Sequence, residues 1–499
     1  MVYHPWMAKT SRVSAPLTAQ DFYRFLQCPH WPYWERFGDA KDRRPLTEAE
    51  EDRLADGLEH EKRVVEGLYP GVMSVRITRR EDGFARTLEL MREGVPAIYQ
   101  GWLMHGEWVG RPDILERRTG KSRLGKWYYV PVDVKRAHEM RKDHKAQLTF
   151  YAVLLEKIQG IFPQHPEVIN GDSERLAFDA EEFLPEFKSL AEALERIRGG
   201  ERPDPVYRKS CTDTSPWGAA CFRLAKETND IALIFNVDVR KLRALRSAGI
   251  RTVDDAAEID PSALEGETGL SLRSLQSIQR QARSLRDSRV MVKEPYVDPA
   301  KGLEIHFDIE SHPPTDRDYL YGLLLREPMG DRYLSFIAAK PEDEEKMWRA
   351  FLSWLSTLPK EFTVFHYAAY EPQRLEVLAR RYGDQDHPDL ARFVSHFVDL
   401  KEDVRNHLVF PLYFYSLKSI GKFLGFGWQG SVKGGGDSIV AYDRWLSSKR
   451  PAELEAIIAY NEEDVRATAF VLDWMRTYAK TAGEFSEPYP WTGHVSRRT

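Results

Sequence analysis

Two short acidic stretches, GRPDIL at residues 110–115 and VPVDVK at residues 130–135, carry the pattern that decides the fold of the first part of the chain. In the second stretch, Val132 and Val134 alternate with Asp133 and Lys135, which predicts a strand with the valines on one face and the acid and base on the other. Two carboxylates can hold a hard divalent cation, and an ammonium group can orient water or stabilise charge that develops on phosphate. The stretches therefore predict a metal site where two strands end, although an ordinary exposed strand face would show the same spacing.

Length and composition limit the class of protein. A chain of 499 residues is too long for one ordinary core, so roughly two to four domains are expected. Hydrophobic residues make up 42% and charged residues 30%, as in soluble globular proteins. No apolar run is long enough to span a bilayer, and the start of the chain lacks the apolar centre of a secretory signal, so we expect a cytoplasmic location without membrane contact. Three cysteines argue against a disulfide framework, and the net charge of -5 does not decide whether nucleic acid is a partner.

Three regions follow one another along the chain. Residues 1–205 mix helical and strand-like patterns and end at glycine and proline breakers. Residues 206–293 are largely helical by pattern and rich in Arg and Lys. Residues 300–482 begin with a strand pattern and then alternate strands and helices. The sequence thus predicts two α/β domains joined by a small helical module.

Further polar residues of the first region can be placed beside Asp113 and Asp133. A proline-free segment from residue 48 to residue 69 predicts a helix that carries His60. A neutral imidazole is a suitable metal ligand, although a surface histidine would look the same. Gln147 and Tyr151 are four residues apart at the start of an apolar run, so they share one helical face. Either could contact phosphate or the lysine, and the alternative is a polar edge on a core helix.

The order and spacing of these residues, with the elements G-R-P-D, D-V-K and Q-x-x-x-Y, resemble the RecB-like branch of the PD-(D/E)XK nucleases over about residues 12 to 200. The resemblance implies a restriction-endonuclease-like fold for this domain. It also implies that Mg2+ or Mn2+ is bound by His60, Asp113 and Asp133. Lys135 would position the attacking water, and Gln147 and Tyr151 would complete the catalytic set.

Several relatives in that branch hold a [4Fe-4S] cluster with one N-terminal cysteine and three more after the nuclease core. Cys28, Cys211 and Cys221 fall in suitable places, but the fourth cysteine is missing. A degenerate site, or three reduced structural cysteines, therefore stays open beside an intact cluster.

The third region has an acidic set of its own. Asp308 and Glu310 are separated by one residue of a predicted strand, so both side chains leave the same face and can share a metal. Tyr460 lies four residues before Asp464 on a predicted helix, and Glu371 follows a strand-like start. This order resembles the DEDD exonuclease group of the ribonuclease-H-like fold in its Tyr-x-x-x-Asp form. The resemblance implies two Mg2+ ions held by Asp308, Glu310, Glu371 and Asp464, with Tyr460 orienting the water.

Two positions leave alternatives open in that resemblance. Glu371 stands where the group normally has Asp, and its longer side chain could shift one metal. Asp399 is either an auxiliary acid or an acid at a helix N-terminus, where the helix dipole favours it.

The helical module contains a segment, residues 239–253, that resembles the second half of a helix-hairpin-helix. A helix is expected to end at Gly249, and Thr252 could cap the next one. Such hairpins present backbone N-H groups to phosphate without reading bases. A spacer bundle with a solvated basic face is the alternative.

The whole arrangement resembles a bacterial family of RecB-like nucleases whose substrate is not defined. The function is therefore predicted from the two acidic sites: a metal-dependent nuclease with nucleic acid as partner, DNA favoured over RNA, acting on single-stranded ends or flaps in repair or processing. Two alternatives remain: a nucleic-acid-binding scaffold that has lost productive geometry, and an RNA-directed exonuclease that acts through the C-terminal domain.

Overall fold

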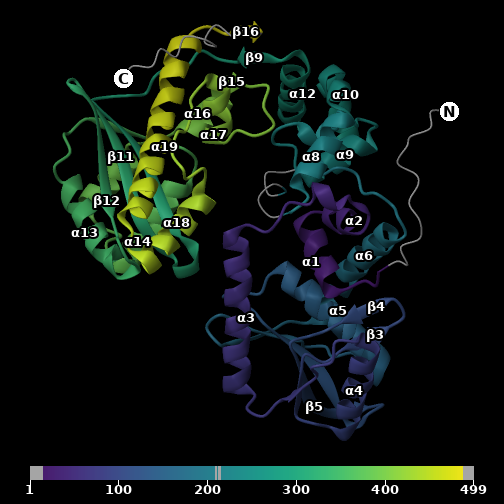
Figure 1. The fold of residues 1–499 in the computed structure, drawn as a ribbon. Coiled ribbons are helices and arrows are strands. Elements are labelled where there is room, and N and C mark those ends of the chain that lie inside the picture. The colour runs from purple at the N-terminus through teal and green to yellow at the C-terminus, as the bar shows by residue number, and fades with distance from the viewer. Residues whose placement is uncertain (1–14, 208–210, 212–214, 487–499) are drawn as a thin grey trace. The chain divides into compact units, whose positions relative to one another are not determined.

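The computed structural model describes residues 15–207, residue 211 and residues 215–486 (Figure 1). The chain divides into two compact units, Met1–Glu227 and Thr228–Thr499, which we call the N-terminal and the C-terminal unit. In the described part of the chain, no helix has the length and apolar character that a membrane span requires.

The N-terminal unit is built on a six-stranded mixed sheet in the order β1-β2-β5-β6-β7-β8. Its strands are β1 (Met73–Ser74), β2 (Ala97–Tyr99), β5 (Ile114–Ser122), β6 (Gly125–Val134), β7 (Glu167–Ile169) and β8 (Arg175–Ala177). A separate small hairpin joins β3 (Leu103–His105) and β4 (Trp108–Gly110). The helices are α1 (Ala19–Gln27), α2 (His30–Phe37), α3 (Glu48–Leu68), α4 (Arg80–Glu93), α5 (Lys142–Gln159), α6 (Ala180–Arg198) and α8 (Gly218–Glu227).

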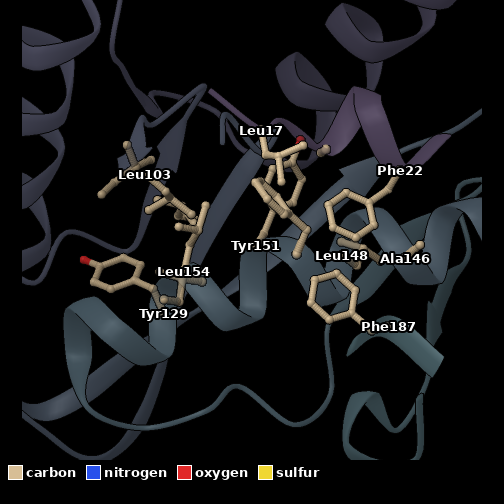
Figure 2. Packing of buried hydrophobic residues seen from close by; sticks show 14 of the residues in the cluster. Leu17, Phe22, Leu103, Tyr129, Ala146, Leu148, Tyr151, Leu154 and Phe187 are labelled. Atoms are coloured by element: carbon tan, nitrogen blue, oxygen red, sulfur yellow. The ribbon is translucent and has the colours of Figure 1, made fainter. Parts of the chain in front are cut away.

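Helix α5 forms the centre of the N-terminal core. Ala146, Leu148 and Leu154 are fully buried on different sides of the helix, and the helix ends at Gly160 in the left-handed region with φ 74°. Phe22 of α1 stacks on Phe187 of α6 with ring centroids 4.9 Å apart, beside the residues of α5 (Figure 2). This packing fixes α5 and therefore the polar residues at its start.

The two strands predicted from the acidic stretches form the long antiparallel hairpin β5-β6. Val132 and Val134 are buried, as their alternation predicts. Asp133, on the opposite face, is also fully buried, because that side of the strand faces protein and not solvent. The predicted helices that carry His60 and Gln147 are confirmed as α3 and α5.

The C-terminal unit begins with four short helices: α9 (Val239–Ser247), α10 (Val253–Glu258), α11 (Pro261–Thr268) and α12 (Leu272–Asp287). The expected helix end is confirmed, since Gly249 follows α9 with φ 81°. The expected cap is also confirmed, because the Thr252 hydroxyl accepts a hydrogen bond from the backbone N-H of Asp255 at 3.0 Å. Gln281 of α12 donates to the carbonyl of Phe410 at 2.7 Å, so these helices pack on the rest of the unit.

A five-stranded mixed sheet in the order β12-β11-β10-β13-β14 forms the body of the C-terminal unit. Its strands are β10 (Leu303–His312), β11 (Arg317–Glu327), β12 (Gly330–Ile337), β13 (Phe362–His366) and β14 (Phe397–Asp399). A small second sheet contains β9 (Arg289–Val292), β15 (Leu408–Val409) and β16 (Gly483–Ser486). The helices are α13 (Glu344–Leu355), α14 (Tyr370–Tyr382), α15 (Pro388–Ser395), α16 (Leu400–His407), α17 (Leu417–Leu424), α18 (Gly435–Ser448) and α19 (Pro451–Tyr478).

The direction of the strands brings polar residues to one edge of this sheet. Strands β10, β13 and β14 are parallel, so their C-terminal ends lie at the same edge. The long helix α19 runs across the sheet over β10 and β11 (Figure 1). Residues in the second half of β10 can therefore meet residues of α19.

Candidate functional site

Three carboxylates meet where α19 crosses β10. Asp308 and Glu310 leave the same face of β10, and Asp464 comes from α19. One ligand oxygen of each lies within 4.8 Å of the others. We call these three residues the acidic triad. Among the described residues, no other group of three or more His, Cys, Asp or Glu side chains meets this spacing.

Ionisation of the three acids of the triad is unfavourable without a cation. Burial raises the pKa of Asp308 well above its usual range, and the neighbouring charges of Glu310 and Asp464 add to the effect. Burial, followed by the charge of Asp464, raises the pKa of Glu310 to about 8. Burial also raises the pKa of Asp464. Oxygen ligands at this spacing, with unfavourable mutual repulsion, fit a hard divalent cation such as Mg2+ or Mn2+.

Each acid of the triad also contacts a neutral donor. The side-chain amide of Asn461 donates to Asp308 at 2.7 Å, and the indole N-H of Trp428 donates to Asp464 at 2.6 Å. The hydroxyl of Tyr319 lies 3.4 Å from Glu310. These donors hold the carboxylates in place, as the outer contacts of metal ligands commonly do.

Tyr460 contacts a lysine that the sequence did not identify as part of the site. The ammonium of Lys418, in the first turn of α17, donates to the Tyr460 hydroxyl at 3.0 Å. It also lies 4.4 Å from the centre of the Tyr460 ring. Burial, and then the charge of Asp464, raises the pKa of Tyr460, so its hydroxyl keeps its proton.

Glu371 lies close to the triad but outside it. It is buried at the start of α14, and one of its carboxylate oxygens is 3.3 Å from Nδ1 of His366. Its charge contributes to the raised pKa of Asp308. The Nδ1 atom of His366 is hydrogen-bonded to the carbonyl of Ala368 at 2.5 Å, so this Glu371 oxygen is buried without a hydrogen-bond partner among the described residues. The structure therefore brings three of the four predicted acids together and leaves Glu371 outside that group.

Asp399 acts at the N-terminus of α16. Its Oδ1 accepts hydrogen bonds from the backbone N-H groups of Lys401 at 2.9 Å and Glu402 at 3.4 Å. The same atom accepts from the backbone of Ala368 at 2.9 Å, a non-glycine residue with φ 78°. These contacts favour the helix-terminal interpretation, and they hold the strained turn that precedes Glu371.

Gly322 of β11 leaves room for the amide that orients Asp308. It pairs with Asp308 across the ladder, and a Cβ added to it would lie 1.5 Å from Oδ1 of Asn461. We expect Gly322→Ala to displace this amide and to destabilise the protein by about 1–3 kcal/mol, as overpacking does. Gly266→Ala, in the open interior of α11, should instead be neutral or slightly stabilising. Chemical denaturation of both variants checks this, and equal stability of the two would contradict it.

In the N-terminal unit, two acids and one lysine meet at the ends of β5 and β6. The Asp113 carboxylate accepts from the backbone N-H of Val134 at 2.8 Å, and the Asp133 carboxylate accepts from the backbone N-H of Asp113 at 3.3 Å. The Lys135 ammonium lies 3.1 Å from Asp133. Burial and the charge of Asp133 raise the pKa of Asp113 well above its usual range. Burial alone would lower the pKa of Lys135, but the two carboxylates outweigh it and raise that pKa.

Helix α3 presents Glu61 to this pair of acids. Glu61 accepts hydrogen bonds from Tyr99 at 2.9 Å and Gln100 at 2.8 Å, and its charge contributes to the raised pKa of Asp113. For the neighbouring His60, burial and nearby arginines lower the pKa. Its Nε2 is buried and has no hydrogen-bond partner among the described residues. A ligand role for His60 stays a prediction, and Glu61 is an acid that the sequence reasoning missed.

The predicted pair on α5 lies beside these groups. The side-chain amide of Gln147 donates to the Tyr151 hydroxyl at 3.2 Å, and that hydroxyl lies 3.4 Å from the carbonyl of Arg111. Burial, followed by the charge of Asp133, raises the pKa of Tyr151. The structure therefore groups Asp113, Asp133, Lys135 and Tyr151, with Gln147 bound to the last.

The three cysteines are buried and are not joined by a disulfide, and the structure brings them together. The Sγ atoms of Cys28 and Cys211 are 3.8 Å apart. A hydrogen bond from Cys211 favours the Cys28 thiolate, but the interaction with Cys221 and burial outweigh it and raise the pKa of Cys28 to about 12. An iron-sulfur cluster at this place stays a prediction.

Comparison with known families identifies a match for one part of the chain. Residues 305–476 match the family model of the RNase_H superfamily, whose members are typically nucleases that use Mg2+ or Mn2+ and bind nucleic acid. The C-terminal unit therefore contains a ribonuclease-H-like domain, and the acidic triad lies within it. No curated protein matches the chain. The match lies outside residues 1–205 and 206–293, where the RecB-like and helix-hairpin-helix-like interpretations stay predictions.

Proposed function

We propose that this chain is a metal-dependent nuclease that hydrolyses phosphodiester bonds of DNA, at single-stranded ends or flaps, in repair or processing. The observation that carries the proposal is the acidic triad, with oxygens within 4.8 Å of one another, inside a ribonuclease-H-like domain. Mg2+ or Mn2+ would be held by Asp308, Glu310 and Asp464, with Glu371 beside them. When bound, the metal supplies water activation and stabilisation of the leaving oxygen.

The protein groups around the triad have separate roles in this proposal. Asn461 and Trp428 fix the orientation of Asp308 and Asp464 through their hydrogen bonds. The Tyr460 oxygen accepts a hydrogen bond from the Lys418 ammonium, so the hydroxyl proton of Tyr460 is left to donate to Asp464 or to an attacking water. A tyrosine held in this way can orient water for attack on phosphorus.

The N-terminal unit would supply a second nuclease centre of the RecB-like PD-(D/E)XK kind. Asp113 and Asp133 are joined through backbone hydrogen bonds, and Lys135 lies next to Asp133. These acids would hold a metal with His60 or Glu61, and the Lys135 ammonium would orient the water. Loss of either centre would then leave the other able to cut.

A non-catalytic role is the second candidate, because Glu371 lies outside the triad. In that case the ribonuclease-H-like domain would bind nucleic acid without cutting it. An RNA-directed exonuclease is the other alternative for the same domain.

Metal dependence is the first test. We expect the full-length protein to cut end-labelled DNA with Mg2+ or Mn2+, and excess EDTA to lower the rate by about 10³-fold or more, since several kcal/mol of charge stabilisation is lost. The panel contains single- and double-stranded DNA and RNA, and it is run on wild type, Asp133→Ala and Asp308→Ala. Binding without cutting in any metal would support the scaffold, and cutting of RNA alone would support the RNA-directed exonuclease.

A further inference from the structure

Lys418 occupies an unusual position beside the acidic triad. Its ammonium donates to the Tyr460 hydroxyl at 3.0 Å and to the backbone carbonyl of Lys433. It also lies 4.4 Å from the centre of the Tyr460 ring and 5.9 Å from that of Trp428. The Trp428 indole in turn donates to Asp464, so the lysine is one side chain away from a metal-binding acid.

The hydrogen bonds of Lys418 do not offset its charge. Its two hydrogen-bond acceptors are a neutral hydroxyl and a neutral carbonyl. Among the residues that the structure describes, the ammonium makes no salt bridge to a carboxylate, and Asp464 and Glu310 act on it only through their charge. An ammonium group has three N-H donors, so one donor remains beyond the two that these acceptors use.

A half-buried lysine held by neutral oxygens and aromatic faces is suited to an anionic ligand. Lysine is a common phosphate binder and acts as a compact point charge. The negative charges that act most strongly on it, those of Asp464 and Glu310, belong to the triad that would hold metal at the bond to be cut. A phosphate group placed between a metal cation and Lys418 would be attracted by the positive charge of each.

We propose that Lys418 binds a non-bridging phosphate oxygen of the strand that is cut, through the N-H that the protein does not use. The proposal rests on the proposed nuclease function of the C-terminal unit and adds the residue that contacts the substrate. A purely structural lysine would hold Tyr460 and the carbonyl of Lys433 without contact to the substrate. The two roles differ in how salt affects the reaction.

The test uses the full-length chain carrying Asp133→Ala, so that cleavage reports the C-terminal site. The measurement is kcat/KM for a labelled single-stranded DNA as a function of salt concentration. For single strands, each phosphate contact contributes about -0.7 to the slope of log affinity against log salt. We expect Lys418→Gln to lower kcat/KM about 10- to 100-fold at low salt and to make the slope shallower by about 0.7. Lys418→Arg should keep most of the slope.

The control is Lys360→Gln, which removes the same charge from an exposed position before β13, at the opposite end of that strand from the triad. It should leave the slope unchanged. Lys418→Gln keeps a side-chain donor for Tyr460, whereas Lys418→Met removes it. If both variants cut more slowly but keep the salt dependence of the parent chain, the inference is overturned in favour of a structural role. If the Asp133→Ala parent does not cut while wild type does, the proposed function of the C-terminal site fails, and this inference fails with it.

Discussion

Asp308→Asn, made in a chain that already carries Asp133→Ala, is expected to lower the remaining cleavage by about 10³-fold or more while stabilising the metal-free protein. Activity should fall because the substitution removes a negative ligand, and several kcal/mol of metal-dependent stabilisation depend on it. Stability should rise by about 1 kcal/mol, because three acids within 4.8 Å of one another repel without a cation. Opposite signs for activity and stability are typical of a functional site.

The stabilisation should depend on pH. Glu310 has its pKa raised from 4.5 to about 8, so the folded state binds more protons than the unfolded state between these values. The free energy of unfolding therefore decreases as pH rises from about 4.5 to about 8. The increase in this free energy caused by Asp308→Asn should accordingly be larger at pH 8 than at pH 5. Urea denaturation in EDTA at both pH values measures the difference, with Asp331→Asn on the exposed part of β12 as control. Equal gains at pH 5 and pH 8 would show that the acids do not repel one another.

The residues of the acidic triad could be predicted from the sequence because their spacing is local. A period of two puts Asp308 and Glu310 on one face of β10, and a spacing of four puts Tyr460 and Asp464 on one face of α19. That β10 and α19 contact each other was predicted from the resemblance to a known order of motifs, and not from the spacing of residues. The family match over residues 305–476 supports that part of the interpretation.

The outer contacts of the triad could not be predicted in the same way. Trp428 lies between two helices, and nothing in its neighbourhood indicates that its indole reaches Asp464. Asn461 directly follows Tyr460, but its contact with Asp308 depends on the missing Cβ of Gly322 on another strand. Such contacts depend on how elements far apart in the sequence pack, which local periodicity does not specify.

The sequence also could not decide whether His60 or Glu61 faces the acids of the N-terminal unit. Neighbouring residues on a helix point about 100° apart, so the rotation of α3 decides which one faces the sheet. The apolar pattern of the helix left that rotation open, because Leu54 and Leu58 are 59% and 67% exposed while Val64 and Val65 are buried. In the structure Glu61 makes the contacts to Tyr99 and Gln100.

Lys135→Met is expected to have the opposite effect on stability from Asp308→Asn. The Lys135 ammonium lies 3.1 Å from the buried Asp133, and its charge offsets those of Asp133 and the half-buried Asp113. Its removal should destabilise the metal-free protein by about 2 kcal/mol, below the 3–5 kcal/mol of a fully buried pair because 24% of the lysine side chain is exposed. In an Asp308→Asn chain it should also lower cleavage by about 10³-fold, within the range for a group that positions water or a proton.

Denaturation in EDTA and in Mg2+ measures the stability effect, with Lys126→Met at the exposed start of β6 as the matched control. Mg2+ should restore most of the lost stability in Lys135→Met, because a divalent cation bound by Asp113 and Asp133 replaces the missing positive charge. If Lys135→Met were as stable as the control without metal, Asp113 would already be protonated when the protein folds. The two acids would then need no cation, and the N-terminal unit would lose the electrostatic reason for binding one.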